Sequence, residues 1–451
     1  MEEKGIAMLL LTPDRIRTLQ RKLYIKAKQE PAYRFYALYD KLYQADILHH
    51  ACRLVKANKG SPGVDGMSFE VIESGIGVGC YLELLSRELQ DKTYRANPVR
   101  RVMIPKADGS LRPLGIPTIR DRVVQMALKL VIEPIFEADF CEHSYGFRPQ
   151  KSAHQAIDAI ADGMWQGQTQ VIDADLSKYF DSIPHSKLMA TVAERIADGA
   201  VLALITQWLK APVIGESENG KTACIGGGKS NRRGTPQGGV ISPLLSNLYL
   251  HLLDRIWQRH ELARKLQAKL VRYADDFVVL CRKDVVTPLA TIRSILEKLE
   301  LNLNESKTKI VDANKEEFYF LGFALKVNIS SKGKRYPHVN PKEQAVEKVK
   351  NRINEITARN QTWRPIKEVV RDLNQVLRGW SGYFHYRNSS LALSKVKRHA
   401  EERLRIHLRK RHKVRTWKES VLRFPRRVLY EEYGLYKVPT VAGWKSAHAL
   451  M

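Results

Sequence analysis

The sequence lacks paired cysteines and long apolar runs, and it is poor in acidic residues relative to basic ones. Its five cysteines are odd in number and form no Cys-x-x-Cys pair, which excludes a disulfide framework and a zinc ribbon and favours a reducing cytoplasm. The apolar run near the N-terminus is too short for a signal peptide or a membrane span, and no longer run follows. Repeats and low-complexity segments are absent too. The 451 residues, 44% of them hydrophobic, therefore predict a globular protein of about two to four domains with no membrane partner.

Acidic residues number 48 against 75 lysines and arginines, so the formal net charge is +27. More than half of this excess, +16, lies after residue 340, where 26 basic residues face 10 acidic ones. Repulsion on this scale is relieved most readily by a polyanion, and nucleic acid is the first candidate. Residues 395–415 are the densest part. Their apolar positions predict a basic helix with one anchored side, whose other side is either a solvated face or a phosphate-binding surface.

Hydrophobic periodicity and turn residues predict a mixed α/β chain. The dipeptide Asp108-Gly109 predicts a tight turn between two strands, and segment 212–233 is expected to be rich in loop. Strands are expected within 99–117, from 168 and on both sides of 275–276, and segment 316–327 completes the mixed α/β unit. Helices are expected over 13–56, 119–136, 186–210, 240–268, 288–301 and most of the chain beyond 341.

Residues 215–222, GESENGKT, match the phosphate-binding P-loop pattern GxxxxGK[ST]. That motif needs a strand before the loop and a helix after it, so that backbone N–H groups surround the phosphates. Here Glu216 and Glu218 would repel phosphate, and the glycine-rich sequence that follows cannot open a helix. We interpret the match as coincidental.

Asp275 and Asp276 lie side by side between two apolar runs. Two like charges in a low dielectric cost several kcal/mol unless a cation or a pKa shift relieves them. Further acids, Asp173 and Asp175, lie where a Val-Ile strand ends. A strand-end carboxylate beside a hairpin-turn carboxylate can hold two Mg²⁺ ions, which activate an attacking oxygen, stabilise a leaving group and orient phosphates. An acidic pair alone is common in surface turns, so the flanking strands and the basic chain carry this prediction.

The YADD sequence and its flanks resemble the palm hairpin of reverse transcriptases, and the Tyr-Ala-Asp-Asp form resembles the reverse transcriptase–maturases encoded by group II introns. Further blocks within about 55–327 agree: NKGSPGVDG, IPKADGSLRPLGIPTIRDRVVQ, HSYGFRP, DADLSKYFDSI, GTPQGGVISPLLSNLYL, LNLNESKTKIV and FLGF. LNQVLRGWSGYFHY, at 373–386, is similar to the maturase-specific block. The resemblance implies a right-hand polymerase of the α/β (α+β) class. Its expected parts are a helical N-terminal extension (1–54), fingers (55–168), palm (169–330), helical thumb (331–409) and a basic DNA-binding C-terminal segment (410–451).

The resemblance assigns the catalytic roles to Asp175, Asp275 and Asp276. With the main-chain carbonyl of Leu176, these residues are expected to hold two Mg²⁺ ions, for which Mn²⁺ can substitute.

The resemblance also implies a nucleotide site. Lys106 and Arg112 are expected on the triphosphate of the incoming nucleotide, where cations suit the leaving group. Phe180 is expected to exclude a 2′-hydroxyl, and a core position for its ring is the alternative. Gln237 is expected beside the nucleotide or template base. Lys307 is expected near the nucleotide phosphates, with a surface lysine as the alternative.

Nucleic-acid contacts are implied at Gly238 and Gly239, whose backbone allows close approach. Gly322 lies in the FLGF block, which is expected to grip the primer or to serve packing. Trp380 and Phe384 are expected to pack inside the thumb. The candidate phosphate contacts in the C-terminal part are Arg378, Lys395, Lys397, Arg398, Arg409, Lys410, Arg411, Lys413 and Arg415.

The function that the resemblance implies is RNA-directed DNA synthesis from intron RNA, with binding of that RNA as a ribonucleoprotein to assist splicing and mobility. Expected partners are group II intron RNA, an RNA template with a DNA primer, target DNA and deoxynucleotides, and the protein is expected to be a monomer or a dimer. One alternative is an RNA-binding protein that serves splicing only, against which the intact acids argue. Another is a reverse transcriptase recruited to DNA repair or phage defence. No block resembles a His-Asn-His endonuclease, so we expect priming from another source, such as a nascent replication strand.

Overall fold

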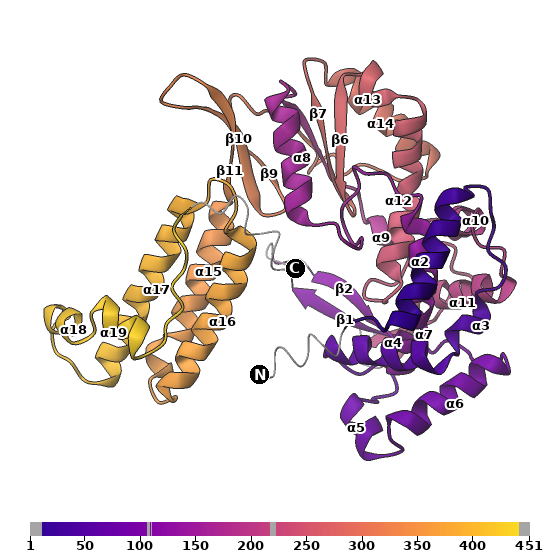
Figure 1. The fold of residues 1–451 in the computed structure, drawn as a ribbon, viewed down its shortest axis with the longest axis horizontal. Coiled ribbons are helices and arrows are strands. Elements are labelled where there is room, and N and C mark those ends of the chain that lie inside the picture. The colour runs from indigo at the N-terminus through magenta and orange to yellow at the C-terminus, as the bar shows by residue number, and fades with distance from the viewer. Residues whose placement is uncertain (1–10, 106–108, 110, 217–221, 442–451) are drawn as a thin grey trace.

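The computed structural model describes residues 11–105, 109, 111–216 and 222–441. Three β-sheets and their flanking helices lead into a helical bundle that begins after residue 341 (Figure 1). Among the described helices, none combines the length and the apolar character needed to cross a membrane.

Helix α7, Ile119–Glu137, is the central helix of the N-terminal part. Thr118 caps it by accepting a hydrogen bond from the backbone N–H of Asp121, and apolar side chains are buried around it even beside the internal Pro134. Helices α2 and α4 pack along α7. The helices of this part besides α7 are α2 (Asp14–Gln29), α3 (Tyr39–Leu42), α4 (Ala45–Ala57), α5 (Phe69–Ser74) and α6 (Val78–Gln90).

The first sheet has the strand order β2-β1-β4-β5. Strands β1 (Val99–Pro105) and β2 (Leu111–Ile116) form the predicted antiparallel hairpin, whose turn residues Lys106 and Asp108 lie outside the described residues. The segment 212–233, expected to be rich in loop, also contains a second hairpin formed by β4 (Val213–Glu216) and β5 (Thr222–Gly226). Strand β4 pairs in parallel with β1, a partner far away in the sequence that no local pattern reports. The P-loop match falls in this second hairpin, and its positions 217–221 are outside the described residues.

The second sheet carries the predicted acidic hairpin and has the strand order β6-β7-β3-β8. One face packs on α12 through side chains such as Ile172 and Val279, and the other packs on α8 through Val171 and Val278. Three of its strands are largely buried: β3 (Gln170–Ala174), β6 (Ala268–Tyr273) and β7 (Asp276–Cys281). The edge strand β8 (Lys309–Asp312) exposes its first two residues, Lys309 and Ile310. The helices of this part are α8 (Ala153–Trp165), α9 (Tyr179–Ser182), α10 (His185–Ala193), α11 (Gly199–Leu209), α12 (Ser242–Arg259), α13 (Leu262–Lys265) and α14 (Val286–Lys298).

A third sheet, in the order β11-β10-β9, joins the second sheet to the bundle. Its strands are β9 (Phe318–Phe320), β10 (Phe323–Ile329) and β11 (Arg335–Pro341). The bundle stands beside the sheets in Figure 1 and has its own apolar core, as the predicted basic helices with one anchored side require. Its helices are α15 (Glu343–Ile356), a 3-10 turn η1 (Arg359–Gln361), α16 (Ile366–Phe384), α17 (Ser390–Arg411), α18 (Trp417–Arg423) and α19 (Arg426–Glu431).

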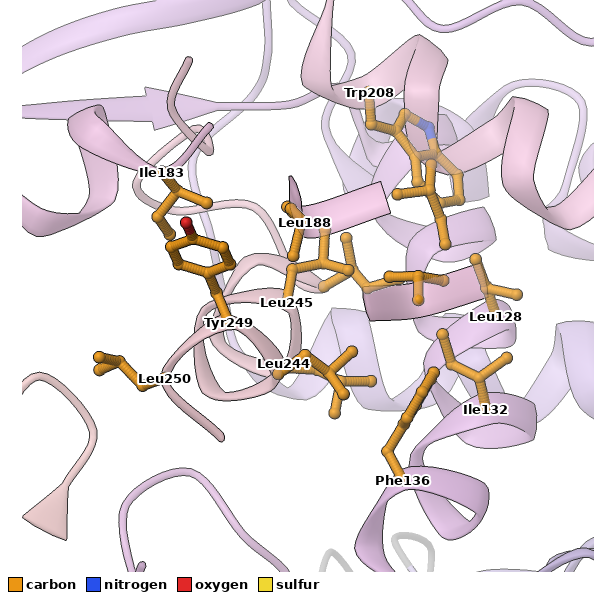
Figure 2. Close-up of a cluster of buried hydrophobic side chains, with 14 of the residues drawn as sticks. Leu128, Ile132, Phe136, Ile183, Leu188, Trp208, Leu244, Leu245, Tyr249 and Leu250 are labelled. Atoms are coloured by element: carbon orange, nitrogen blue, oxygen red, sulfur yellow. The ribbon is translucent and has the colours of Figure 1, made fainter. Parts of the chain in front are cut away.

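Helix α12 is anchored in the main hydrophobic core. Figure 2 shows its side chains Leu244, Leu245 and Tyr249 among residues of other elements, including Leu188 of α10 and Phe136 of α7. All five side chains are almost completely buried. This helix is therefore a rigid support against which neighbouring functional segments can be held.

Candidate active site

The three predicted catalytic carboxylates meet at one end of the second sheet. Strand β3 ends at Ala174, which pairs with Phe277 of β7, and Asp175 is the next residue. Asp276 begins β7, and Asp275 lies in the turn between β6 and β7. The antiparallel ladder thus delivers Asp175 to the same edge of the sheet as the hairpin turn.

Burial and neighbouring negative charges raise the pKa values of two of these carboxylates, Asp275 and Asp276. Burial raises the pKa of Asp276 to about 6, with further contributions from Asp275 and Asp175. Burial also raises the pKa of Asp275, while the positive charge of Arg112 lowers it. Burial raises the pKa of Asp173, which lies in strand β3 two residues before Asp175, to about 6. Asp173, Asp175 and Asp275 are half-buried and Asp276 is exposed. Four acids gathered in this way are short of positive charge, which a divalent cation would supply.

Within the described ranges, no three His, Cys, Asp or Glu side chains are grouped closely enough to hold a metal ion as they stand. Other groups take the positions around the Asp175 carboxylate: Lys307 Nζ lies 3.4 Å from its Oδ2, and Asn304 Nδ2 donates to the same oxygen at 3.1 Å. The donor chemistry fits a hard divalent cation, because carboxylate oxygens are its preferred ligands.

Asn304 is a site residue that the sequence reasoning missed. Its backbone N–H donates to the carbonyl oxygen of Asp175 at 2.8 Å, in addition to the side-chain bond to the carboxylate. The preceding residue, Leu303, forms a β-bridge with Leu176. Asn304 therefore holds both the backbone and the side chain of Asp175. Its position in the block LNLNESKTK, three residues before Lys307, was the available signal.

Two of the predicted nucleotide-binding residues contact each other. Arg112 Nε donates to Gln237 Oε1 at 3.0 Å, and the backbone N–H of Gly115 donates to the carbonyl oxygen of Gln237 at 2.5 Å. Gly238 has φ +112°, and a Cβ added there would lie 2.4 Å from the carbonyl oxygen of Gly115. A Cβ on Gly239 would meet the first residue of α12. The close approach that these glycines allow is therefore between the β1–β2 hairpin, the GTPQGG loop and α12.

Phe180 lies in α9, directly after the acidic end of β3. It is 8% exposed, and its carbonyl oxygen accepts a hydrogen bond of 2.7 Å from the backbone N–H of Thr235. The ring belongs to the main hydrophobic core and contacts the ring of Tyr179 at a centroid distance of 5.5 Å. Most of the Phe180 ring is thus core, and a role of its exposed edge in selecting the sugar stays a prediction.

The predicted nucleic-acid contacts of the C-terminal part fall into three groups. Arg411 donates to the carbonyl oxygens of Thr362 at 2.7 Å and Arg364 at 2.6 Å, and the guanidinium carbon of Arg378 lies 5.4 Å from the ring centroid of Tyr436. These two arginines hold parts of the bundle together. Arg409 and Lys397 are half-buried. The exposed candidates are Lys395, Arg398, Lys410, Lys413 and Arg415.

The FLGF block packs against the bundle. Gly322 has φ +81°, and a Cβ there would lie 3.3 Å from the ring of Phe384. Tyr383 Oη donates to the carbonyl oxygen of Leu321 at 2.8 Å. Phe384 is buried, and Trp380 donates from Nε1 to the carbonyl oxygen of Ala345 at 3.2 Å, so the predicted packing role of these two rings is confirmed. A contact of Gly322 with a primer stays a prediction.

Two family models match the chain. Residues 104–325 match the reverse transcriptase (RNA-dependent DNA polymerase) family, and residues 346–424 match the group II intron maturase-specific domain. The carboxylate edge and strand β2 lie within the first stretch, and most of the bundle lies within the second. The chain belongs to the reverse transcriptases and carries a group II intron maturase domain. A mixed right-hand polymerase fold, as predicted, follows from this membership.

Individual proteins are similar to parts of the chain. Protein YkfC of Escherichia coli K12 is 37% identical over 347 residues, which are 69% of this chain and 88% of that protein. The group II intron-encoded protein LtrA of Lactococcus lactis subsp. cremoris is 33% identical over 285 residues, 61% of this chain. The match spans only 43% of LtrA. Among solved structures, telomerase from Candida albicans with a fragment of telomeric RNA is 13% identical, with 79% of this chain and 69% of that chain covered and a TM-score of 0.40.

Proposed function

We propose that the protein is an RNA-directed DNA polymerase that copies intron RNA into DNA and binds this RNA to assist its splicing and mobility. The observation that carries the polymerase part is the meeting of Asp175, Asp275 and Asp276 at one sheet edge in a chain of the reverse transcriptase family. The maturase-specific match and the exposed cations of the bundle support the RNA-binding part.

In this proposal, Asp175 and Asp275 hold Mg²⁺, with help from Asp276 and the carbonyl oxygen of Leu176. When bound, two such ions supply the activation of the primer hydroxyl and the neutralisation of the pyrophosphate. Lys307 lies beside Asp175 and is free to turn toward the nucleotide phosphates, because its side chain is 60% exposed.

The fingers hairpin serves the incoming nucleotide. The positive charge of Arg112 lowers the pKa of Asp275, and Arg112 donates a hydrogen bond to Gln237. Its side chain therefore lies between the carboxylates and the GTPQGG loop. A guanidinium in this position binds phosphate oxygens through two parallel hydrogen bonds. Lys106, at the end of the same hairpin, is proposed to bind the triphosphate with it.

The exposed cations of the bundle are proposed to bind the folded intron RNA through its phosphates. A-form RNA hides its base edges in a deep, narrow major groove, so proteins hold it by backbone contacts and by exposed loops. Lys410 and Lys413, at the end of α17, are exposed and have no acidic neighbour between Glu402 and Glu419 in the sequence.

Primer extension on an RNA template with Mg²⁺ tests the proposal, with deoxynucleotides and ribonucleotides supplied separately. We expect extension with deoxynucleotides only, and retention of a structured intron RNA by the same protein. The variant Asp275→Asn should lose this extension. Its matched control is Glu305→Gln, because Glu305 is an exposed acid of the neighbouring segment that pairs with Arg293. Tight RNA binding without extension on any template would replace the polymerase with an RNA-binding splicing protein.

A further inference from the structure

The residue before Asp275 has an unusual backbone conformation. Ala274 has φ +57°, in the left-handed region that residues with a side chain rarely adopt. Ala274 is buried, and it connects the end of β6 to the first catalytic carboxylate of the turn. The direction of the Asp275 side chain therefore depends on what holds Ala274 in this conformation.

Arg272 holds the Ala274 carbonyl from inside the protein. Its Nη1 donates to the carbonyl oxygen of Ala274 at 2.9 Å and to Asn247 Oδ1 at 3.1 Å. Its Nε donates to both oxygens of Asp254, at 3.0 and 3.2 Å, and its Nη2 forms a further bond to Asp254. The side chains of Arg272 and Asp254 are completely inaccessible to solvent. One planar guanidinium thus joins helix α12 to the turn.

A second contact confines the turn from the other side. A Cβ added to Gly146 would lie 2.3 Å from the backbone nitrogen of Ala274, so these two backbones are in direct contact. Asn247 Nδ2 donates to the carbonyl oxygen of Gly146 at 2.6 Å. The backbone of Arg272 also pairs with the same segment, since its N–H donates to the carbonyl oxygen of His143 at 2.9 Å. Asn247 therefore bridges the two groups that enclose Ala274.

Helix α12 supports both carboxylate segments. Asn247 and Asp254 are seven residues apart, which places them on one face of the helix two turns from each other. On the same helix, the carbonyl oxygen of Ser246 accepts a hydrogen bond of 2.6 Å from Tyr179 Oη. Tyr179 follows Asp175 by four residues. The apolar anchoring of α12 in Figure 2 makes it a fixed reference for the two segments.

We propose that Arg272 is a positioning residue for the catalytic carboxylates: with Asn247 and Asp254 it fixes the left-handed turn at Ala274 and so sets Asp275 relative to Asp175. This inference rests on the proposed polymerase function. A buried ion pair is a weak device for stability, because an apolar pair of the same volume often serves as well. The ion pair of Arg272 and Asp254 gains a specific function if it orients the carboxylates that bind the metal without binding the metal itself.

The substitution Arg272→Lys separates this role from charge compensation. A lysine retains the positive charge against Asp254, but its single ammonium cannot reach Asp254, Asn247 and the Ala274 carbonyl in one plane. Gly146→Ala disturbs the same turn from the other side without touching the ion pair, because its Cβ would overlap the backbone of Ala274. The matched control is Arg195→Lys. Arg195 is also buried, pairs with Asp139 at 3.0 Å and donates to a carbonyl oxygen of the N-terminal helix α2 at 2.7 Å.

Two measurements are made on each variant at a temperature where circular dichroism shows it folded. The first is Mn²⁺ affinity of the protein without nucleic acid, by electron paramagnetic resonance titration; the second is kcat and KM for deoxynucleotides. For Arg272→Lys and Gly146→Ala we expect Mn²⁺ affinity and kcat each to fall about 10-fold or more, with KM nearly unchanged. For Arg195→Lys we expect a lower melting temperature, with Mn²⁺ affinity, kcat and KM unchanged.

The inference is overturned if both turn variants retain the Mn²⁺ affinity and kcat of the wild type, or lose them only in proportion to their unfolded fraction, as the control would. If Arg272→Lys does not fold, Gly146→Ala alone decides between these results. A wild-type protein without polymerase activity would contradict the proposed function, while the Mn²⁺ titration would still decide whether Arg272 positions the carboxylates.

Discussion

Lys307 Nζ lies 3.4 Å from Asp175 Oδ2, so the carboxylate edge of the second sheet carries a cation of its own chain. Asn304 bonds to the same oxygen at 3.1 Å. The two residues come from one short segment that follows Leu303, the bridge partner of Leu176. In our account, Lys307 compensates Asp175 until a metal ion and a nucleotide arrive, and then pairs with phosphate.

Replacement of Lys307 by glutamine is expected to raise KM for deoxynucleotides about 3- to 10-fold, with a smaller change in kcat. The reason is that the exposed lysine contributes to binding of the charged phosphates and not to the chemical step. Steady-state kinetics at two ionic strengths measures this, and Lys315→Gln, an exposed lysine elsewhere, is the control. A change confined to kcat would contradict the assignment.

Arg112 and Gln237 are expected to act as a unit in nucleotide binding. Arg112→Ala and Gln237→Ala should each raise KM, and the double variant should raise it by less than the product of the two effects, with a coupling of about 1 kcal/mol. The physical reason is the 3.0 Å hydrogen bond between them, which either substitution removes. A double-mutant cycle on kcat/KM measures the coupling. Strict additivity would mean that the bond has no role in binding the nucleotide.

The exclusion of ribonucleotides depends on Phe180 in our proposal. Phe180→Val is expected to lower the preference for deoxynucleotides about 10- to 100-fold, because the smaller side chain leaves room for a 2′-hydroxyl. Valine is chosen over alanine because the ring is largely buried, and a larger cavity would destabilise the core. Single-nucleotide incorporation of matched dNTP and rNTP measures the ratio. An unchanged ratio in a folded variant would make Phe180 a core residue only.

The bundle offers a test of RNA binding with an internal control. The double substitution Lys410→Gln with Lys413→Gln is expected to weaken intron RNA binding and to reduce the slope of log K against log salt by about 0.7–0.9 for each phosphate that the protein no longer neutralises. Arg411→Gln should instead lower the melting temperature, because Arg411 bonds to two carbonyl oxygens within the bundle. Filter binding at several salt concentrations measures the slope for the double lysine variant and for Arg411→Gln. Equal effects of both variants on the slope would contradict this division.

A buried histidine predicts how stability depends on pH. Burial lowers the pKa of His251 from its ordinary 6.5 to about 4, while Asp254 opposes the shift. The unfolded chain therefore binds a proton that the folded protein does not, so the contribution of His251 to stability is complete above pH 6.5 and is lost as the pH falls toward 4. In this window the free energy of unfolding should fall by up to about 1 kcal/mol per pH unit more in the wild type than in His251→Gln.

Urea unfolding at pH 7.5, 6, 5 and 4.5 measures this difference between the two proteins. The imidazole ring lies 5.3 Å from the ring of Phe140, so the substitution is expected to cost some stability at every pH. The test is therefore the slope of the free energy of unfolding against pH, and not its absolute value. Parallel pH profiles would show that His251 titrates normally in the folded state.

Local pattern predicted the acidic hairpin and the β1–β2 hairpin well, because each is made of neighbouring strands around a short turn. It also predicted α7, whose cap and apolar positions lie within one segment. The strand β4 escaped prediction because its partner β1 is distant in the chain and its own sequence is short and contains a glycine.

Side-chain roles were harder to predict for a different reason. Arg411 and Lys410 are adjacent in the sequence and equally basic, yet one faces carbonyl oxygens inside the bundle and the other faces solvent. Asn304 and Asn247 are polar residues of ordinary type, and only folding brings them to Asp175 and Arg272. Sequence reasoning named the carboxylates from their flanking strands and from the family resemblance, but the groups that hold them are visible only in three dimensions.

The central claim is that the carboxylates after the end of β3 and at the start of β7 serve nucleotidyl transfer. Single-turnover incorporation of one deoxynucleotide on an RNA template, by the wild type and by Asp275→Asn, tests it most directly when primer–template binding is measured in the same samples. We predict incorporation by the wild type and a loss of at least about 1,000-fold in Asp275→Asn, with binding unchanged. Incorporation by Asp275→Asn at the wild-type rate would contradict the claim.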